Sequence, residues 1–166
     1  MDSKTILDFI CRRRSVRRYQ KKEIPAEIFE LLMNAAMAAP SGNNVQPWEF
    51  VIVRDPKNKE ALSRVHPWVH MAAGAAAAVV VLGDKSSEWW EDDCAAATEN
   101  LLLAAANLGL GAVWSGIKED QSRAVRKILG VPDNLAVLCI IPMGYPAESP
   151  PPHTKYRQDK VHWDRY

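Results

Sequence analysis

The stretch that says most about how this chain folds is RRRSVRRY, at residues 12–19. Ile6, Phe9 and Ile10 precede it with helical spacing, which predicts an amphipathic helix that the arginines finish. Cations suit the negative end of a helix macrodipole. A second stretch, APSGNNVQPW at residues 39–48, is rich in hydrogen-bonding groups. Together the two stretches predict a site for a phosphorylated, planar ligand with polar edges.

The length and charge of the chain limit the class of protein. A chain of 166 residues is expected to form one domain around one core. The formal net charge of +1 makes the arginine stretch a local feature, which argues against nucleic acid as the main partner. The longest apolar run, residues 71–82, is too short for a bilayer span, and the amino terminus lacks a signal-peptide core. We therefore expect no membrane partner.

The three cysteines are Cys11, Cys94 and Cys139. They are far apart, odd in number and embedded in apolar sequence, which fits neither a disulfide framework nor a metal site. We expect reduced, buried thiols, no bound metal and a cytoplasmic location. A thiol-redox function has no Cys-x-x-Cys pair to support it.

Hydrophobic periodicity and breaker residues divide the chain into helices and strands. Helices are expected from residue 3 into the arginines, after Pro25 as far as Pro40, and over residues 58–65, 89–108 and 121–129, with Gly109 ending the fourth. Strands are expected over residues 49–53, 76–82 and 135–141. Because paired helices precede the first strand, the expected class is α+β with a sheet covered on both faces. The chain is expected to be a single domain over 1–166, with 146–166 as a wrapping tail.

Several motifs, in order, resemble those of the FMN-dependent nitroreductase family. They are RRSVR at 13–17, AAPSGNNVQPWEFV at 38–51, DCAAATENLLLAA at 93–105, GLGAVW at 109–114, KYR at 155–157 and VHW at 161–163. The likeness covers almost the whole chain and says nothing about the substrate. It implies a mixed sheet flanked by helices, and an obligate homodimer with two FMN sites at the subunit interface.

The expected phosphate site consists of Arg13, Arg14, Ser15 and Arg17. A phosphate group carries about −1.5 to −2 charge, and guanidinium groups bind its oxygens in pairs. The alternative is a solvated basic helix end, and Arg12 and Arg18 are expected to be solvated in either case. In the family a basic residue of the tail completes this site. Lys155 is the favoured candidate and Arg157 is the other.

In the family, the loop that matches residues 40–44 lies against the flavin of the partner subunit. This makes Pro40, Ser41 and Asn43 candidates for cofactor contact, although Asn43 and Gln46 could instead fasten the loop itself. Gly42 allows a close backbone approach under either interpretation. Taken alone, the motif would indicate only a helix stop and a turn.

The resemblance also marks Trp114, Ser115 and Gly116, which match the segment whose backbone amides face the flavin N5 edge. Such amides stabilise charge without a titrating side chain, although Trp114 fits a core position equally well. His70 stands where small members commonly have a Lys or Arg near the flavin N1 and C2 carbonyl. There a neutral histidine would only donate a hydrogen bond and a protonated one would mimic the lysine. The alternative is a solvent-facing loop histidine.

The function implied by the resemblance is ping-pong electron transfer from NAD(P)H, through bound FMN, to an electron-poor acceptor such as a nitroaromatic or a quinone. The GLG at 109–111 follows a helix rather than a strand, so it is not a dinucleotide fingerprint. Both substrates must then use one flavin face in turn. No catalytic side chain is predicted, because the cofactor carries the chemistry. The alternatives are a flavin-binding or flavin-handling protein without robust NAD(P)H turnover and, less favoured, a basic interaction module.

Overall fold

The computed structural model describes residues 3–151 and 156–166. Its helices are α1 (Ser3–Arg12), α2 (Ala26–Met37), α3 (Pro56–Ser63), α4 (Trp90–Asn107) and α5 (Glu119–Leu129), with short 3-10 helices η1 (Gly42–Asn44), η2 (Pro67–Gly74) and η3 (Gln158–Lys160). Its strands are β1 (Trp48–Val53), β2 (Ala77–Asp84), β3 (Gly111–Ala112), β4 (Ser115–Gly116) and β5 (Leu135–Gly144). Every expected helix and strand is present, with ends displaced by a few residues. The short elements η1, η2, η3, β3 and β4 were not expected.

The strands form one sheet in the order β1-β2-β5-β3, and β4 also pairs with β5. All of these strand pairs are antiparallel. A parallel bridge between Ser15 and Ala112 places the arginine segment outside β3 and makes the arrangement mixed. One edge of the sheet is therefore β1, and the other is formed by β3 and β4.

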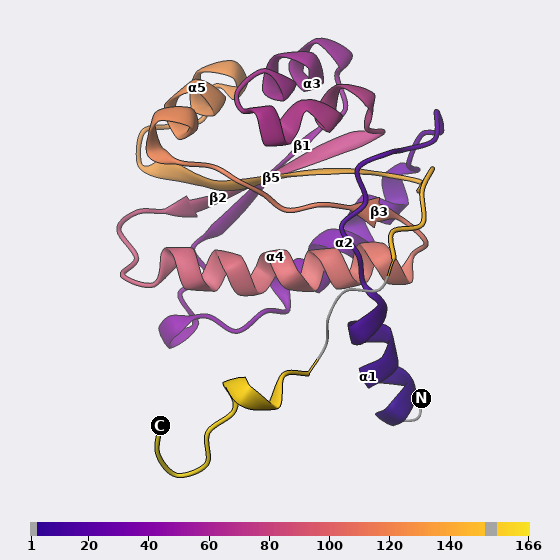
Figure 1. Cartoon of the computed structure of the whole chain (residues 1–166). Coiled ribbons are helices and arrows are strands. Elements are labelled where there is room, and N and C mark those ends of the chain that lie inside the picture. Colours follow the sequence, from indigo (N-terminus) through magenta and orange to yellow (C-terminus); the bar gives the residue numbers. More distant parts are fainter. Residues whose placement is uncertain (1–2, 152–155) are drawn as a thin grey trace.

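Helices cover both faces of the sheet (Figure 1), as expected for the α+β class. On one face α2 and α4 pack on Val79 and Val81 of β2, and on the other α3, η2 and α5 pack around Val80 and Leu82. Because both faces are buried, β2 is apolar at successive positions and shows no alternation of polar and apolar residues.

The two ends of the chain extend away from this packed body on the same side of α4 (Figure 1). The helix α1 forms as predicted, but its apolar side is not covered within one chain, with Leu7 64% exposed. The described tail from Tyr156 to Tyr166 is also exposed, and Trp163 is 83% exposed. Both ends thus carry apolar side chains that one chain does not bury.

The cysteines only partly match the expectation of buried thiols. Cys94 and Cys139 are buried, whereas Cys11 is exposed because α1 stands away from the core, so the prediction is wrong for Cys11. Burial raises the pKa of the Cys94 thiol to about 12, and it also raises the pKa of Cys139 above its usual value. In the described part of the chain no helix has the length and apolar composition to span a membrane.

Candidate functional site

The outer edge of the sheet, residues 111–117, presents backbone groups to its surroundings. Val113 and Ile117 donate their N–H groups to β5 carbonyls at 3.3 and 3.1 Å. Because N–H groups alternate in direction along an antiparallel strand, those of Trp114 and Gly116 point away from β5. Gly116 is also exposed, so this edge can offer a backbone donor to a ligand.

The arginine segment lies along this edge. Val16 donates its N–H to the Ala112 carbonyl at 3.0 Å, and its side chain is buried. Gly111 makes the close approach possible, because a Cβ at that position would lie 2.6 Å from Val16 Cβ. Ser15 and Arg17 flank the buried Val16 in an extended chain and are more exposed than it is. The segment is thereby fixed with two polar side chains away from the core.

A cavity of about 520 Å³ opens beside the segment. It is lined by Ser15, Arg17, Arg18, His70 and residues 148–151. This volume is in the range of small-molecule sites. Three predicted site residues, Ser15, Arg17 and His70, are therefore brought together from two separate elements.

Glu148 holds the arginine segment from the tail. Its Oε1 accepts hydrogen bonds from the backbone N–H groups of Arg17 and Arg18 at 2.6 and 3.2 Å. Its Oε2 lies 3.9 Å from Arg18 Nε, and the Arg17 guanidinium has no ionic partner among the residues that the structure describes. Sequence reasoning missed Glu148, because it stands among prolines without any periodic pattern.

Arg13 and Arg14 do not line this cavity. Arg13 Nε lies 3.2 Å from Glu99 Oε1 on α4. Arg14 donates from Nη1 to the carbonyls of Cys11 and Arg13, and from Nε to that of Pro151 at 3.1 Å. These contacts fix the end of α1 against α4 and the tail. A phosphate-binding role for either arginine stays a prediction.

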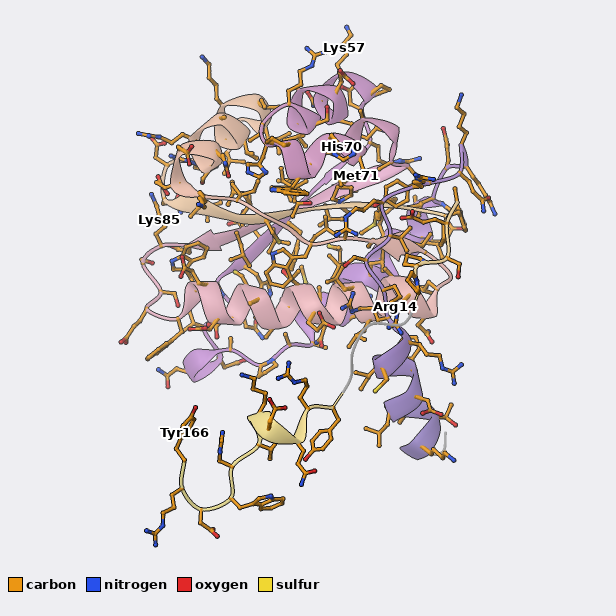
Figure 2. All side chains as sticks on the ribbon, viewed as in Figure 1. Arg14, Lys57, His70, Met71, Lys85 and Tyr166 are labelled. Carbon is orange, nitrogen blue, oxygen red and sulfur yellow. The ribbon has the colours of Figure 1, made fainter. Side chains whose placement is uncertain are left out.

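His70 lies on the η2 side of the sheet, whereas Arg14 lies on the α4 side (Figure 2). The Nδ1 atom of His70 is 2.8 Å from the Pro67 carbonyl. A carbonyl can only accept, so Nδ1 carries the proton and a neutral ring presents Nε2 as an acceptor. This differs from the expectation that a neutral His70 would donate to the cofactor. With Nδ1 so engaged, Nε2 donates only when the ring is protonated.

Ser115 connects the sheet edge to η2. Its hydroxyl donates to the Trp68 carbonyl at 2.9 Å, and the residue is buried. The side chain therefore connects two elements, and by the same alternation the N–H of Ser115 points toward β5. A flavin contact by Ser115 stays a prediction. Trp114 is half-buried and packs against the core under α4, which supports the core interpretation for part of its ring. A flavin contact by Trp114 stays a prediction.

The loop of residues 40–46 lies at a different place. Its cavity, of about 420 Å³, is lined by Asn43 and Gln46 among others, and it shares no lining residue with the cavity beside the arginine segment. Ser41 Oγ accepts from the Gln46 N–H at 3.0 Å, so Ser41 and Gln46 fasten the loop. Pro40 and Asn43 are exposed. Within one chain, these residues do not meet Ser15, Arg17 and His70.

Arg157, in the far part of the tail, does not line the cavity. Arg157 pairs with Asp159, with Nε and Oδ1 3.0 Å apart, on the tail that extends away from the body to Tyr166 (Figure 2). Lys155 lies outside the described residues. The completion of the phosphate site by either residue therefore stays a prediction.

Known proteins resemble this chain along most of its length. The chain matches the model of the nitroreductase family over residues 10–73 and 63–145. A Methanothermobacter thermautotrophicus protein, provisionally named NADH dehydrogenase/NAD(P)H nitroreductase, is 38% identical over 97% of this chain and 87% of its own. A crystal structure from Bacteroides thetaiotaomicron with the same provisional name is 42% identical, with a TM-score of 0.94 over 98% of both chains.

A crystal structure from Desulfovibrio desulfuricans, provisionally named a nitroreductase, was solved in complex with FMN. It is 30% identical, with a TM-score of 0.88 over 97% of both chains. The family, the fold class and the enzyme class expected from the sequence are confirmed by these matches. The chain therefore belongs to the nitroreductase family and is an oxidoreductase.

Proposed function

We propose that this protein is an FMN-dependent NAD(P)H oxidoreductase that passes electrons to an electron-poor acceptor, such as a nitroaromatic or a quinone, in a ping-pong sequence. The observation that carries the proposal is the meeting of Ser15, Arg17 and His70 around one cavity, beside the segment that pairs with Ala112 at the sheet edge. Bound FMN would accept and return a hydride at its ring. The residues of the chain bind, orient and tune it.

The residues around the cavity fit FMN. The Arg17 guanidinium offers charge without a competing ionic partner in the described chain, and Ser15 offers a hydroxyl. Gly116 does not line the cavity, but farther along the same sheet edge its backbone N–H offers a directional donor that cannot titrate. A Cβ on Gly116 would meet only Trp114 Nε1, at 3.9 Å, so the side on which a side chain would stand is open. Glu148 is the acidic group at the cavity, and two backbone N–H groups partly offset its charge.

The architecture supports the proposed ping-pong order. The strand pairs are antiparallel, and the GLG motif follows α4 rather than a strand, so the described part of the chain has no dinucleotide-binding βαβ unit. NAD(P)H and the acceptor would therefore take turns at one face of the flavin. The names of the relatives include an NAD(P)H nitroreductase, which supports this choice of reductant.

A homodimer is part of the proposal. The exposed apolar residues of α1 and of the tail, such as Leu7 and Trp163, form surface of the kind that marks an interface. The loop 40–46 carries three further predicted flavin contacts, Pro40, Ser41 and Asn43, yet it lies apart from the cavity of its own chain. A partner that brings its loop to this cavity would complete the site, and the tail would wrap around that partner.

The test is the cofactor and its turnover. The purified protein is expected to be yellow, to release FMN in mild acid and to oxidise NAD(P)H with a nitroaromatic acceptor, giving parallel double-reciprocal lines. Recovery of FAD or of no flavin would contradict the proposal, and intersecting lines would contradict the one-site order. Bound FMN without NAD(P)H oxidation would favour a flavin-handling protein. A colourless protein that shifts labelled RNA at physiological salt would favour the basic interaction module.

A further inference from the structure

Asp93 is the one buried carboxylate among the described residues, at 6% exposure. It lies in the first turn of α4, where negative charge suits the helix macrodipole. Its Oδ1 accepts the Gly42 N–H at 2.9 Å, while Oδ2 is buried without a hydrogen-bond partner in the described chain. A buried oxygen without a donor is unfavourable. Apart from the macrodipole, the benefit of a carboxylate at this position comes from the bond that Oδ1 accepts from Gly42.

The loop on the other side of that bond is strained. Asn43, Asn44 and Gln46 have φ values of 51°, 56° and 53°, in the left-handed region that L side chains rarely adopt. The internal hydrogen bonds of the loop are exposed to water. Among the described residues, the hydrogen bond that Gly42 donates to Asp93 is the one that joins residues 41–46 to another part of the chain. It is therefore the hydrogen bond that ties the loop to α4.

Gly42 also sits directly on the start of α4. A Cβ on Gly42 would lie 2.9 Å from Trp89 Cδ1, so the backbone reaches this position only without a side chain. The close contact and the hydrogen bond act at one residue. They fix where the loop leaves α2 and in which direction its polar groups point.

We infer that Asp93 is a positioning residue, which holds residues 41–46 in the conformation that meets the flavin of the partner subunit. The inference rests on the proposed function, because it takes the loop to face FMN. Asp93 is buried behind Gly42 and acts only through the loop. Without its acceptor, a smaller fraction of loops has the competent conformation, and the apparent FMN affinity falls by the same factor.

The experiment compares Asp93→Ala, Asp93→Asn and the matched control Asp92→Ala, whose exposed carboxylate stands in the same turn. Peptide-resolved hydrogen exchange on the flavin-free protein is expected to accelerate over residues 41–46 in D93A and not elsewhere. FMN titration by fluorescence quenching is expected to show an affinity about tenfold lower in D93A and about two- to fivefold lower in D93N. Asn keeps the acceptor without its charge, and charged acceptors bond roughly twice as strongly. D92A is expected to stay within about twofold of the unmodified protein.

Exchange and FMN affinity in D93A equal to those of D92A would overturn the inference. Faster exchange throughout D93A would overturn it as well, since that result indicates general destabilisation. If D93A does not fold, the same measurements on D93N test the inference. Hydrogen exchange over residues 41–46 in D93N that equals exchange in the unmodified protein would overturn it. An unmodified protein that binds no flavin would refute the proposed function instead. Exchange over residues 41–46 would then still show whether Asp93 holds the loop.

Discussion

Replacing Arg17 by Ala is expected to weaken FMN binding by roughly tenfold to more than a hundredfold. The guanidinium has no ionic partner in the described chain, and the bond of Arg17 to Glu148 uses the backbone N–H, which Ala keeps. The substitution therefore removes the contact with the ligand and little else. Hydrogen bonds to charged groups contribute about 1.5–3 kcal/mol. Since about 1.4 kcal/mol is a factor of ten in affinity, the expected range follows.

The assay is titration of FMN into the flavin-free protein, followed by fluorescence quenching. Arg12→Ala is the matched control, because this arginine belongs to the same run but lies on α1, away from the cavity, with a side chain 76% exposed. R12A is expected to bind FMN within about twofold of the unmodified protein, since exposed ion pairs contribute little. R17A that binds FMN as tightly as the unmodified protein would refute the reasoning. An equal loss in both variants would mean that general positive charge, and not this cavity, attracts the cofactor.

Three further results are expected. One thiol, Cys11, should react with a disulfide reagent at pH 8 in the native protein, and all three thiols should react after denaturation. Burial raises the pKa of Cys94 to about 12 and keeps its thiol protonated, so two rapidly reacting thiols in the native protein would contradict this prediction. Deleting residues 156–166 should convert the dimer into a flavin-poor monomer in analytical ultracentrifugation, because Trp163 and Tyr166 are exposed in one chain and would pack on the partner. A truncated protein that stays dimeric and retains FMN would argue against a wrapping tail. His70→Lys should keep FMN occupancy and raise the flavin midpoint potential, because a fixed cation favours the more negatively charged reduced form of the flavin. An unchanged potential in a redox titration would place His70 away from the flavin.

The sequence determined the local elements and the family. Helical spacing in α1, α2 and α4 and the unbroken apolar runs of β2 and β5 are properties of neighbouring residues, so they can be read without knowledge of the fold. The continuous burial of β2 also follows from its composition, because a strand without polar alternation needs cover on both faces. The two-residue strands β3 and β4 are too short to carry any periodicity, and they became visible only through their pairing with β5.

Only the tertiary structure decided which predicted residues share a site. The sequence presents Arg13, Arg14 and Arg17 as equivalent, yet the helix ends at Arg12 and the extended segment after it pairs with Ala112. Burial of Val16 against β3 then leaves Ser15 and Arg17 at the cavity, while Glu99 holds Arg13 on α4.

Glu148 and Asp93 could not be found from the sequence either, because each acts on a backbone N–H more than 50 residues away along the chain. Local periodicity contains no information about such distant contacts. They exist only once the sheet has brought its edge, the start of α4 and the tail to their final places.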